Sequence, residues 1–344
     1  IEHSSKIGNG CHIMGGASIA GRVKIGNYTK FKNCIGTIKQ DGNKFISRYG
    51  DEPGVMKGVA FFEYSNGNTY IGETKNYNPN GLGILRIKDG SFYIGQSSNQ
   101  IMTGWGIFYW KKNNKYVLGQ LKDHSHNGFA AVVDPTDMLT LQRGIFKNNN
   151  YFKNSKKIEP QCMGSYINPI ESKDWTNCRG EFNAAGLFYD SDFTNGVPNG
   201  IAWVRLFEGE LSKALGHEPY TYVGELKISK DTGWGERTGM GITLLDDQMI
   251  QVGSYNEGHY HGKGISVWPN GDIYIGYVKK DKRNGQGDYI AIDGTWESGQ
   301  WKNNKLNGYA IRYRIDGSVL KEGIWDETLP SSKIIGVSEL ILYL

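Results

Sequence analysis

No apolar run in the chain approaches the roughly 18 residues that a membrane-spanning helix needs, so the sequence predicts no membrane span. Charge of one sign is not in excess either, because 39 basic and 35 acidic residues are interleaved along the 344 residues. The net charge of +4 is typical of a solvated surface, and no nucleic-acid partner is expected. Long runs of Leu, Ala and Glu are missing as well, which favours strands over helices.

Cysteine is scarce, and its four copies lack the spacing of a metal site. Cys11, Cys34, Cys162 and Cys178 include no C-x-x-C pair, so a structural zinc site is not expected. Their spacing leaves open whether they are oxidised. The sequence starts at Ile1 and has no signal peptide, no glycine-rich phosphate loop that opens a helix and no nucleophile elbow. No cofactor is therefore expected.

Glycine is abundant instead, and it recurs at a fixed interval. Asn-Gly or Asp-Gly occurs at Gly271, Gly294 and Gly317, each 23 residues after the one before. A second glycine follows each turn, and a Gly-x-Gly or Gly-x-Ala pair closes the unit. Asn-Gly and Asp-Gly between alternating apolar residues indicate type I′ hairpin turns, in which both central residues have positive φ. Each unit therefore predicts one β-hairpin plus a loop to the next.

The same unit occurs earlier in the chain. Tyr70-Ile71-Gly72 is followed by Gly81-Leu82-Gly83, and the same letters return 23 residues later. This pattern of Tyr-x-Gly, a spacer and Gly-x-Gly resembles the MORN repeat over roughly 55–155 and 196–327. The resemblance implies an elongated antiparallel β-hairpin array that serves as a scaffold or binding surface for protein partners. Between the two blocks the period weakens. The inserted segments 158–176 and 208–219 are either candidate contact loops or degenerate repeats that only bend the array.

The start of the chain has a different period. Apolar residues lie six positions apart at Ile1, Ile7, Ile13, Ile19, Ile25 and Phe31. This resembles the hexapeptide repeat of left-handed parallel β-helices over 1–36, and it implies two coils of such a helix. Because repeat arrays usually need at least about three units, we expect more coils before Ile1 and self-association as a trimer. Acyltransferases with this helix need a catalytic histidine between subunits, which two coils holding His3 and His12 cannot build.

Two short histidine motifs and several acidic residues are the candidates for chemistry. His124 and His126, and likewise His259 and His261, lie at alternate positions where a strand would put both on one face. Neither pair has an obvious third ligand, so solvated histidines are favoured over a metal site. The acidic candidates for glycoside cleavage are Asp190, Asp192, Asp246 and Asp247. They lie in turns, where aspartate is common for conformational reasons, and no catalytic residue is assigned.

Aromatic residues are more numerous than a thin solvated sheet can bury on one face. The candidates for a binding surface are Trp105, Tyr109, Trp110, Trp268, Tyr274, Trp296, Trp301 and Trp325. Such residues either pack across the concave side of the sheet or contact a partner. Aromatic faces suit a protein partner and also the rings of a surface glycan.

The predicted fold is all-β, a short left-handed parallel β-helix followed by an elongated antiparallel β-hairpin array. The domains are the β-helix (1–40), hairpins (41–155), degenerate repeats with inserted loops (156–225), hairpins (226–330) and a tail (331–344). The predicted function is that of a non-enzymatic structural and interaction protein, such as a virion component of the phage tail-fibre kind. Two alternatives stay open: an intracellular MORN-type scaffold that links cytoskeletal or membrane partners, and a glycan-binding or glycan-cleaving enzyme.

Overall fold

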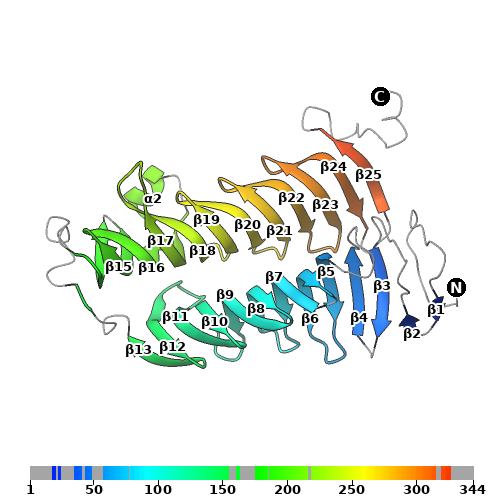
Figure 1. Ribbon diagram of the computed structural model, residues 1–344, viewed down its shortest axis with the longest axis horizontal. Helices are drawn as coiled ribbons and strands as arrows, with labels where there is room; N and C mark the ends of the chain where they lie inside the picture. The colour runs from blue at the N-terminus through cyan, green and yellow to red at the C-terminus, as the bar shows by residue number, and fades with distance from the viewer. Residues whose placement is uncertain are drawn as a thin grey trace.

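The computed structural model describes residues 18–20, 22–24, 35–40, 43–48, 57–76, 78–154, 160–162, 175–184, 186–215, 218–314 and 319–326. Over these residues the chain forms two large antiparallel sheets of consecutive hairpins (Figure 1). The predicted all-β class and the antiparallel hairpin array are confirmed. None of the helices in the described ranges is long and apolar enough to cross a membrane.

The first sheet contains eleven strands in chain order. They are β3 (Ile35–Gln40), β4 (Asn43–Arg48), β5 (Lys57–Glu63), β6 (Thr69–Lys75), β7 (Asn78–Arg86), β8 (Phe92–Ser98), β9 (Ile101–Trp110), β10 (Lys115–Lys122), β11 (Ser125–Val133), β12 (Thr140–Lys147) and β13 (Asn150–Asn154). Each strand pairs with the next along the chain, so every contact in the ladder is local in sequence.

The second sheet contains twelve strands, again in chain order. They are β14 (Cys178–Ala184), β15 (Leu187–Thr194), β16 (Val197–Leu206), β17 (Tyr220–Ile228), β18 (Gly235–Leu245), β19 (Ile250–Asn256), β20 (His259–Val267), β21 (Ile273–Lys279), β22 (Lys282–Ile290), β23 (Trp296–Lys302), β24 (Lys305–Tyr313) and β25 (Val319–Trp325). A short helix, α2 (Glu210–Leu215), lies in the predicted insertion 208–219. Cys162 and Cys178 form a disulfide with their Cα atoms 5.0 Å apart.

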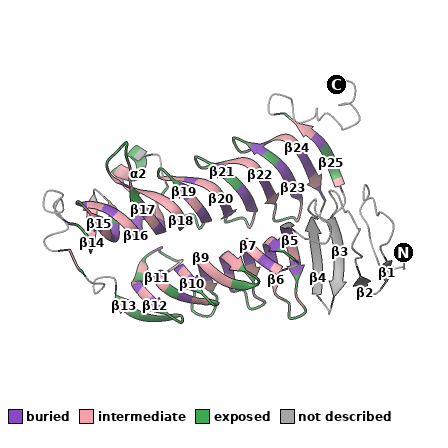
Figure 2. Cartoon of the chain, in the orientation of Figure 1, coloured by how far each residue is buried: buried purple, intermediate pink, exposed green. Residues whose placement is uncertain are grey.

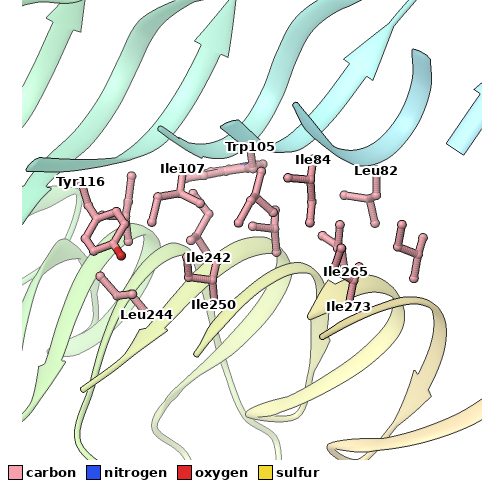
Figure 3. Packing of buried hydrophobic residues seen from close by; sticks show 14 of the residues in the cluster. Leu82, Ile84, Trp105, Ile107, Tyr116, Ile242, Leu244, Ile250, Ile265 and Ile273 are labelled. Atoms are coloured by element: carbon pink, nitrogen blue, oxygen red, sulfur yellow. The ribbon is translucent and has the colours of Figure 1, made fainter. Parts of the chain in front are cut away.

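The two sheets pack face to face, with the chain running along the first and returning along the second (Figure 1). Ile84 and Ile107 of the first sheet lie opposite Ile242 and Ile265 of the second in one buried cluster (Figure 3). Figure 2 shows buried residues along the strands of both sheets and exposed residues at the turns. The hairpin array therefore folds back on itself and covers its own apolar face.

Strand alternation gives each sheet two different faces. In β21, Ile273 and Ile275 belong to the core between the sheets, whereas Tyr274 packs in a separate cluster. Since successive side chains point to opposite sides of a strand, Tyr274 lies on the side away from the other sheet. We call the sides that meet the inner faces and the opposite sides the outer faces.

Two kinds of turn connect the strands, and the predicted type I′ turn is wrong at the Asn-Gly site. The Gly271 N–H donates to the Trp268 carbonyl at 2.9 Å, and in that turn only Gly271 has positive φ (94°). This is a type I turn followed by a left-handed glycine. Type I′ turns occur at the other hairpin ends, where Lys280 and Asp281 have φ of 48° and 65°. Gly317 lies outside the described residues.

The left-handed β-helix predicted for 1–36 is not shown. Most of that segment lies outside the described residues. The two strands described there, β1 (Ser18–Ala20) and β2 (Arg22–Lys24), pair antiparallel, with Ile19 opposite Val23. A β-helix stacks its strands in parallel, so this pairing differs from the predicted arrangement. The predicted tail 331–344 also lies outside the described residues.

Candidate functional site

A tyrosine lies over a pair of glycines on the outer face of four hairpins, those that begin at Tyr70, Tyr93, Tyr222 and Tyr274. In the β6–β7 hairpin the Tyr70 ring covers Gly72 and Gly83, and a Cβ on Gly83 would overlap that ring. The Tyr70 hydroxyl donates to the Glu73 carbonyl at 2.8 Å, at the point where the strand register shifts. The same hydrogen bond to the residue three positions on recurs from Tyr93, Tyr222 and Tyr274. The spacing of tyrosine and glycines is thus a packing requirement of the bulged hairpin.

The two outer faces differ at one repeat position, the residue two after the first glycine of the hairpin (Gly72 in the β6–β7 hairpin), here called the post-glycine position. In the first sheet it holds Thr74, Ser97, Leu121 and Phe146. In the second sheet it holds Leu226, Tyr255, Val278, Trp301 and Trp325, and Phe193 follows Ser191 at the equivalent place. At Thr74 and Ser97 the first sheet has small hydroxyl residues where the second sheet has large apolar ones, whereas Leu121 and Phe146 are apolar like those of the second sheet.

Large side chains close the outer face of the second sheet. Trp301 meets Tyr274 edge-to-face with ring centroids 5.7 Å apart, and its Nε1 donates to the Gly287 carbonyl at 3.0 Å. The Arg283 guanidinium lies 4.4 Å from the Trp301 ring. Trp301 is only 4% exposed and Tyr274 is fully buried. The neutral Trp301 ring therefore covers this part of the sheet, and a backbone acceptor and the Arg283 cation hold it there.

The outer face of the first sheet instead contains an open groove of about 210 Å³ over β6–β9. Tyr64, Tyr70 and Tyr93 supply aromatic rings to its walls. The aliphatic lining comes from Pro79, Leu85 and Met102. Aromatic and aliphatic surface open to solvent in this way is the usual lining of a binding groove.

The polar part of the groove is uncharged. Asn66, Asn68, Gln100 and Ser97 border the aromatic walls, and the lining contains no acidic or basic side chain. Burial raises the pKa of the Tyr64 phenol to about 12, so this hydroxyl remains protonated at neutral pH. The groove can therefore donate and accept hydrogen bonds, but it offers no ion pair to a ligand.

The eight aromatic residues predicted as a binding surface do not gather on one face. Trp105, Tyr109 and Trp296 belong to or pack against the core between the sheets. Trp110 is exposed by 38% and stacks on Phe108 with centroids 4.1 Å apart. The remaining four pack on the outer face of the second sheet: Trp268, Tyr274, Trp301 and Trp325.

None of these eight residues lines the groove of the first sheet. The groove residues that sequence reasoning missed include Tyr70, Tyr93 and Ser97. A usable signal was present, because aligned repeats place Ser97 where Trp301 stands 204 residues later. A search for aromatic residues finds positions such as Trp301, where the outer face is closed. It overlooks Ser97, where the equivalent aromatic residue is missing and the face is open.

The predicted histidine pairs lie at hairpin ends. His124 is exposed and its Nδ1 accepts from the Met102 N–H at 3.3 Å, whereas His126 is buried. His259 Nδ1 lies 2.5 Å from a carboxylate oxygen of Asp281, and both side chains are partly exposed. Within the described ranges, no group of three or more His, Cys, Asp or Glu residues is placed to hold a metal ion.

The acidic candidates are engaged by arginines or by backbone. Asp190 lies 2.6 Å from Arg143 and 2.9 Å from Arg179, and it is 1% exposed. Arg143 comes from the first sheet and Asp190 from the second, so this cluster ties the sheets together where the chain folds back. Asp192 also pairs with Arg179. Asp246 pairs with Arg205, and the Asp247 carboxylate accepts a hydrogen bond from the Met249 N–H.

Comparison with known families detects MORN repeats at four places: residues 70–92, 252–273, 274–296 and 298–319. The resemblance to this family is confirmed for those four repeats. No match was found among curated protein sequences.

Two of the solved structures that match this chain do so at low sequence identity. One is the TCP10 domain of Danio rerio CPAP in complex with a peptide of STIL, at 10% identity over 84% of this chain and 97% of that one, with a TM-score of 0.18. Another is the TCP domain of Drosophila melanogaster SAS-4 with a proline-rich motif of Ana2, at 9% identity over 71% and 84%, with a TM-score of 0.16. TM-scores this low support no conclusion about fold or function.

Proposed function

We propose that the protein is a non-enzymatic β-scaffold that holds a segment of a partner protein in the groove of its first sheet. The observation that carries this proposal is the groove itself, an open apolar surface on a framework whose counterpart in the second sheet is closed. The MORN repeats detected at four positions support a scaffold role. An array of locally paired hairpins is a rigid platform, and such platforms commonly present extended binding surfaces.

The chemistry of the groove favours an extended, uncharged segment. The rings of Tyr70 and Tyr93 and the aliphatic groups of Leu85 and Met102 would contact apolar side chains. The amides of Asn66, Asn68 and Gln100 would pair with the backbone of the segment. A neutral partner avoids burying a charge that the lining cannot compensate.

Selection from a random peptide display library tests the proposal. Selected peptides should bind the wild-type protein and lose affinity for Leu85→Glu, which places an unpaired charge in the groove, by about tenfold or more. Ile292→Glu is the matched control, because Ile292 is 65% exposed in a turn of the second sheet. Equal binding to the wild-type protein and Leu85→Glu would refute the groove as the binding site.

A glycan is the second candidate ligand, because tyrosine rings bordered by amide groups also suit a sugar. A glycan array probed with the wild-type protein and Leu85→Glu tests this candidate. We propose no glycan-cleaving activity. The engagement of Asp190, Asp192 and Asp246 by arginines supports this choice, since a catalytic pair needs one carboxyl group free to donate a proton.

The setting of the scaffold is a separate proposal with two alternatives. A virion component such as a tail fibre would use the β-helix predicted for 1–36 to form a trimer. An intracellular scaffold linking cytoskeletal or membrane partners would be a monomer or dimer. Sedimentation of the chain distinguishes them, because only the first predicts a stable trimer.

A further inference from the structure

The second sheet contains a filled counterpart of the groove. A shift of 204 residues superimposes the two repeat patterns, so that Tyr70 corresponds to Tyr274 and Ser97 to Trp301. By the same shift, Leu85 corresponds to Tyr289 and Pro79 to Arg283, whose side chains lie beside Trp301. Four of the residues that line the groove are thus the equivalents of Trp301 and its neighbours. The groove occupies the place that an indole fills in the second sheet.

The framework around the two places is the same. Tyr70 and Tyr274 each donate to the carbonyl three residues on, at 2.8 and 2.7 Å. A Cβ on Gly83 or on Gly287 would overlap the neighbouring tyrosine ring in the same way. The Gly287 carbonyl accepts the Trp301 indole N–H, and Gly83 provides the corresponding carbonyl in the first sheet. The side chains around this framework differ: Ser97 stands where Trp301 covers the tyrosine, and Tyr93 of the groove wall corresponds to Glu297.

We infer that the groove receives an aromatic side chain, with tryptophan the best fit, presented by an extended uncharged segment of the partner protein. This inference rests on the proposed function and names the residue that anchors the partner. The indole lies edge-on against Tyr70 and donates its N–H to the Gly83 carbonyl, as Trp301 does with Tyr274 and Gly287. The uncharged lining matches a neutral ring, and large aromatic residues are the usual anchors of small interfaces.

Calorimetric titration with two probe peptides tests the inference. The probes are acetyl-Gly-Ser-Trp-Ser-Gly-amide and the same peptide with leucine in place of tryptophan. The tryptophan peptide should bind the wild-type protein about tenfold more tightly or better, since an unmatched group in a shaped pocket costs roughly that factor. Equal affinities for the two peptides would overturn the inference.

The Ser97→Trp variant places an indole from the protein itself in the groove. This variant should bind the tryptophan peptide at least about tenfold more weakly than the wild-type protein does. Ser98→Trp is the matched control, because Ser98 is the neighbouring residue of β8, is exposed and does not line the groove. Ser98→Trp should bind as the wild-type protein does. Undiminished binding to Ser97→Trp would overturn the inference.

A second measurement does not depend on the folding of Ser97→Trp. Trp301→Ser opens the corresponding place in the second sheet, and 3-methylindole should raise its melting temperature by more than it raises that of the wild-type protein. No such rise would contradict the premise that this framework accepts an indole.

The peptide selection separates this inference from the proposed function. Selected peptides that lose binding to Leu85→Glu but lack aromatic residues would overturn the aromatic anchor and leave the scaffold proposal intact. Peptides that bind the wild-type protein and Leu85→Glu equally would refute the proposed function itself. Aromatic-rich peptides that discriminate between the two proteins would support both.

Discussion

The outer faces of the two sheets share one framework and differ in what covers it. Tyr70 and Tyr274 lie over equivalent glycines and make equivalent hydrogen bonds. The second sheet then adds Trp301 and Arg283 above the tyrosine, whereas the first sheet has Ser97 and Pro79 at those positions. The comparison separates the residues that make the hairpin from the residues that decide whether its outer face is closed or open.

Removing the Trp301 ring, compared with changing Ser97 at the equivalent position, should give the largest difference in the free energy of unfolding between the two faces. Trp301→Ala deletes a side chain that is 4% exposed and should lower the free energy of unfolding by roughly 3–5 kcal/mol. Ser97→Ala at the equivalent position removes one hydroxyl that donates to the Gly81 carbonyl at 3.3 Å, and should cost about 1 kcal/mol or less. Urea denaturation followed by circular dichroism measures both values. Equal losses would mean that the two faces do not differ as described.

Substitution of the equivalent glycines under the two tyrosines should lower the free energy of unfolding by the same amount in both sheets. Gly83→Ala and Gly287→Ala each push a Cβ into a tyrosine ring and should each cost roughly 2–3 kcal/mol by overpacking. Alanine already stands at the equivalent positions Ala130 and Ala310, where the tyrosine is replaced by Val117 and Glu297.

A double-mutant cycle checks the cause of this loss. Adding Tyr70→Val to Gly83→Ala should recover part of the stability, because the clashing ring is gone. Urea midpoints of the two single variants and the double variant supply the coupling energy. Purely additive losses would show that the glycine is needed for another reason.

The hairpins could be predicted from the sequence because their signals are local. Glycine at a turn and glycine under a tyrosine are required by the backbone and ring within one repeat, so their spacing gives the unit directly. Turn type cannot be predicted in the same way, since Asn-Gly serves both a type I′ turn and a type I turn with a following left-handed glycine. The hydrogen bond of Trp268 with Asp272 closes a longer loop than type I′ requires, and only the structure supplies it.

The folding back of the array and the groove could not be predicted in this way. An apolar stripe such as Ile273 and Ile275 suits any partner layer, and nothing within one repeat says that the layer is the other half of the same chain. The groove depends on the absence of a large residue at Ser97, which only becomes visible when the repeats are compared with one another. Aromatic content pointed to Trp301 and Trp296, which are buried.

His126 gives the first sheet a pH dependence on its own outer face. Burial lowers the pKa of its imidazole from 6.5 to about 4, against opposing hydrogen bonds with Asn149 and the Val117 backbone. The pKa of His126 is lower in the folded state than in the unfolded state. The free energy of unfolding is therefore highest above pH 6.5 and decreases as the pH falls toward 4. Lowering the pH from 7.5 to 5 should cost about 2 kcal/mol.

Denaturation midpoints at a series of pH values measure that loss. His126→Gln keeps a polar side chain that does not titrate, so its stability should fall less over the same interval. An unchanged pH profile in His126→Gln would exclude this histidine as the cause.

Substituting Arg283 should change the free energy of unfolding least. It tests whether a cation helps to close the outer face of the second sheet. Its guanidinium lies 4.4 Å from the Trp301 ring and 5.1 Å from the Tyr289 ring, and it donates to the Asn304 carbonyl at 2.9 Å. Arg283→Leu keeps an apolar stem over the rings and removes the charge, so it should cost about 1 kcal/mol. The midpoint of urea denaturation and the emission maximum of tryptophan fluorescence measure the change.

Lys279→Leu is the matched control for Arg283→Leu, because Lys279 is an exposed cation of the neighbouring strand and should change stability by less than about 0.5 kcal/mol. A loss in Arg283→Leu with a red-shifted emission would mean that the guanidinium shields Trp301 from water as well as binding it. If both variants matched the wild-type protein, the aromatic rings alone would close the second face. The difference between the faces would then reduce to the post-glycine position, Ser97 against Trp301.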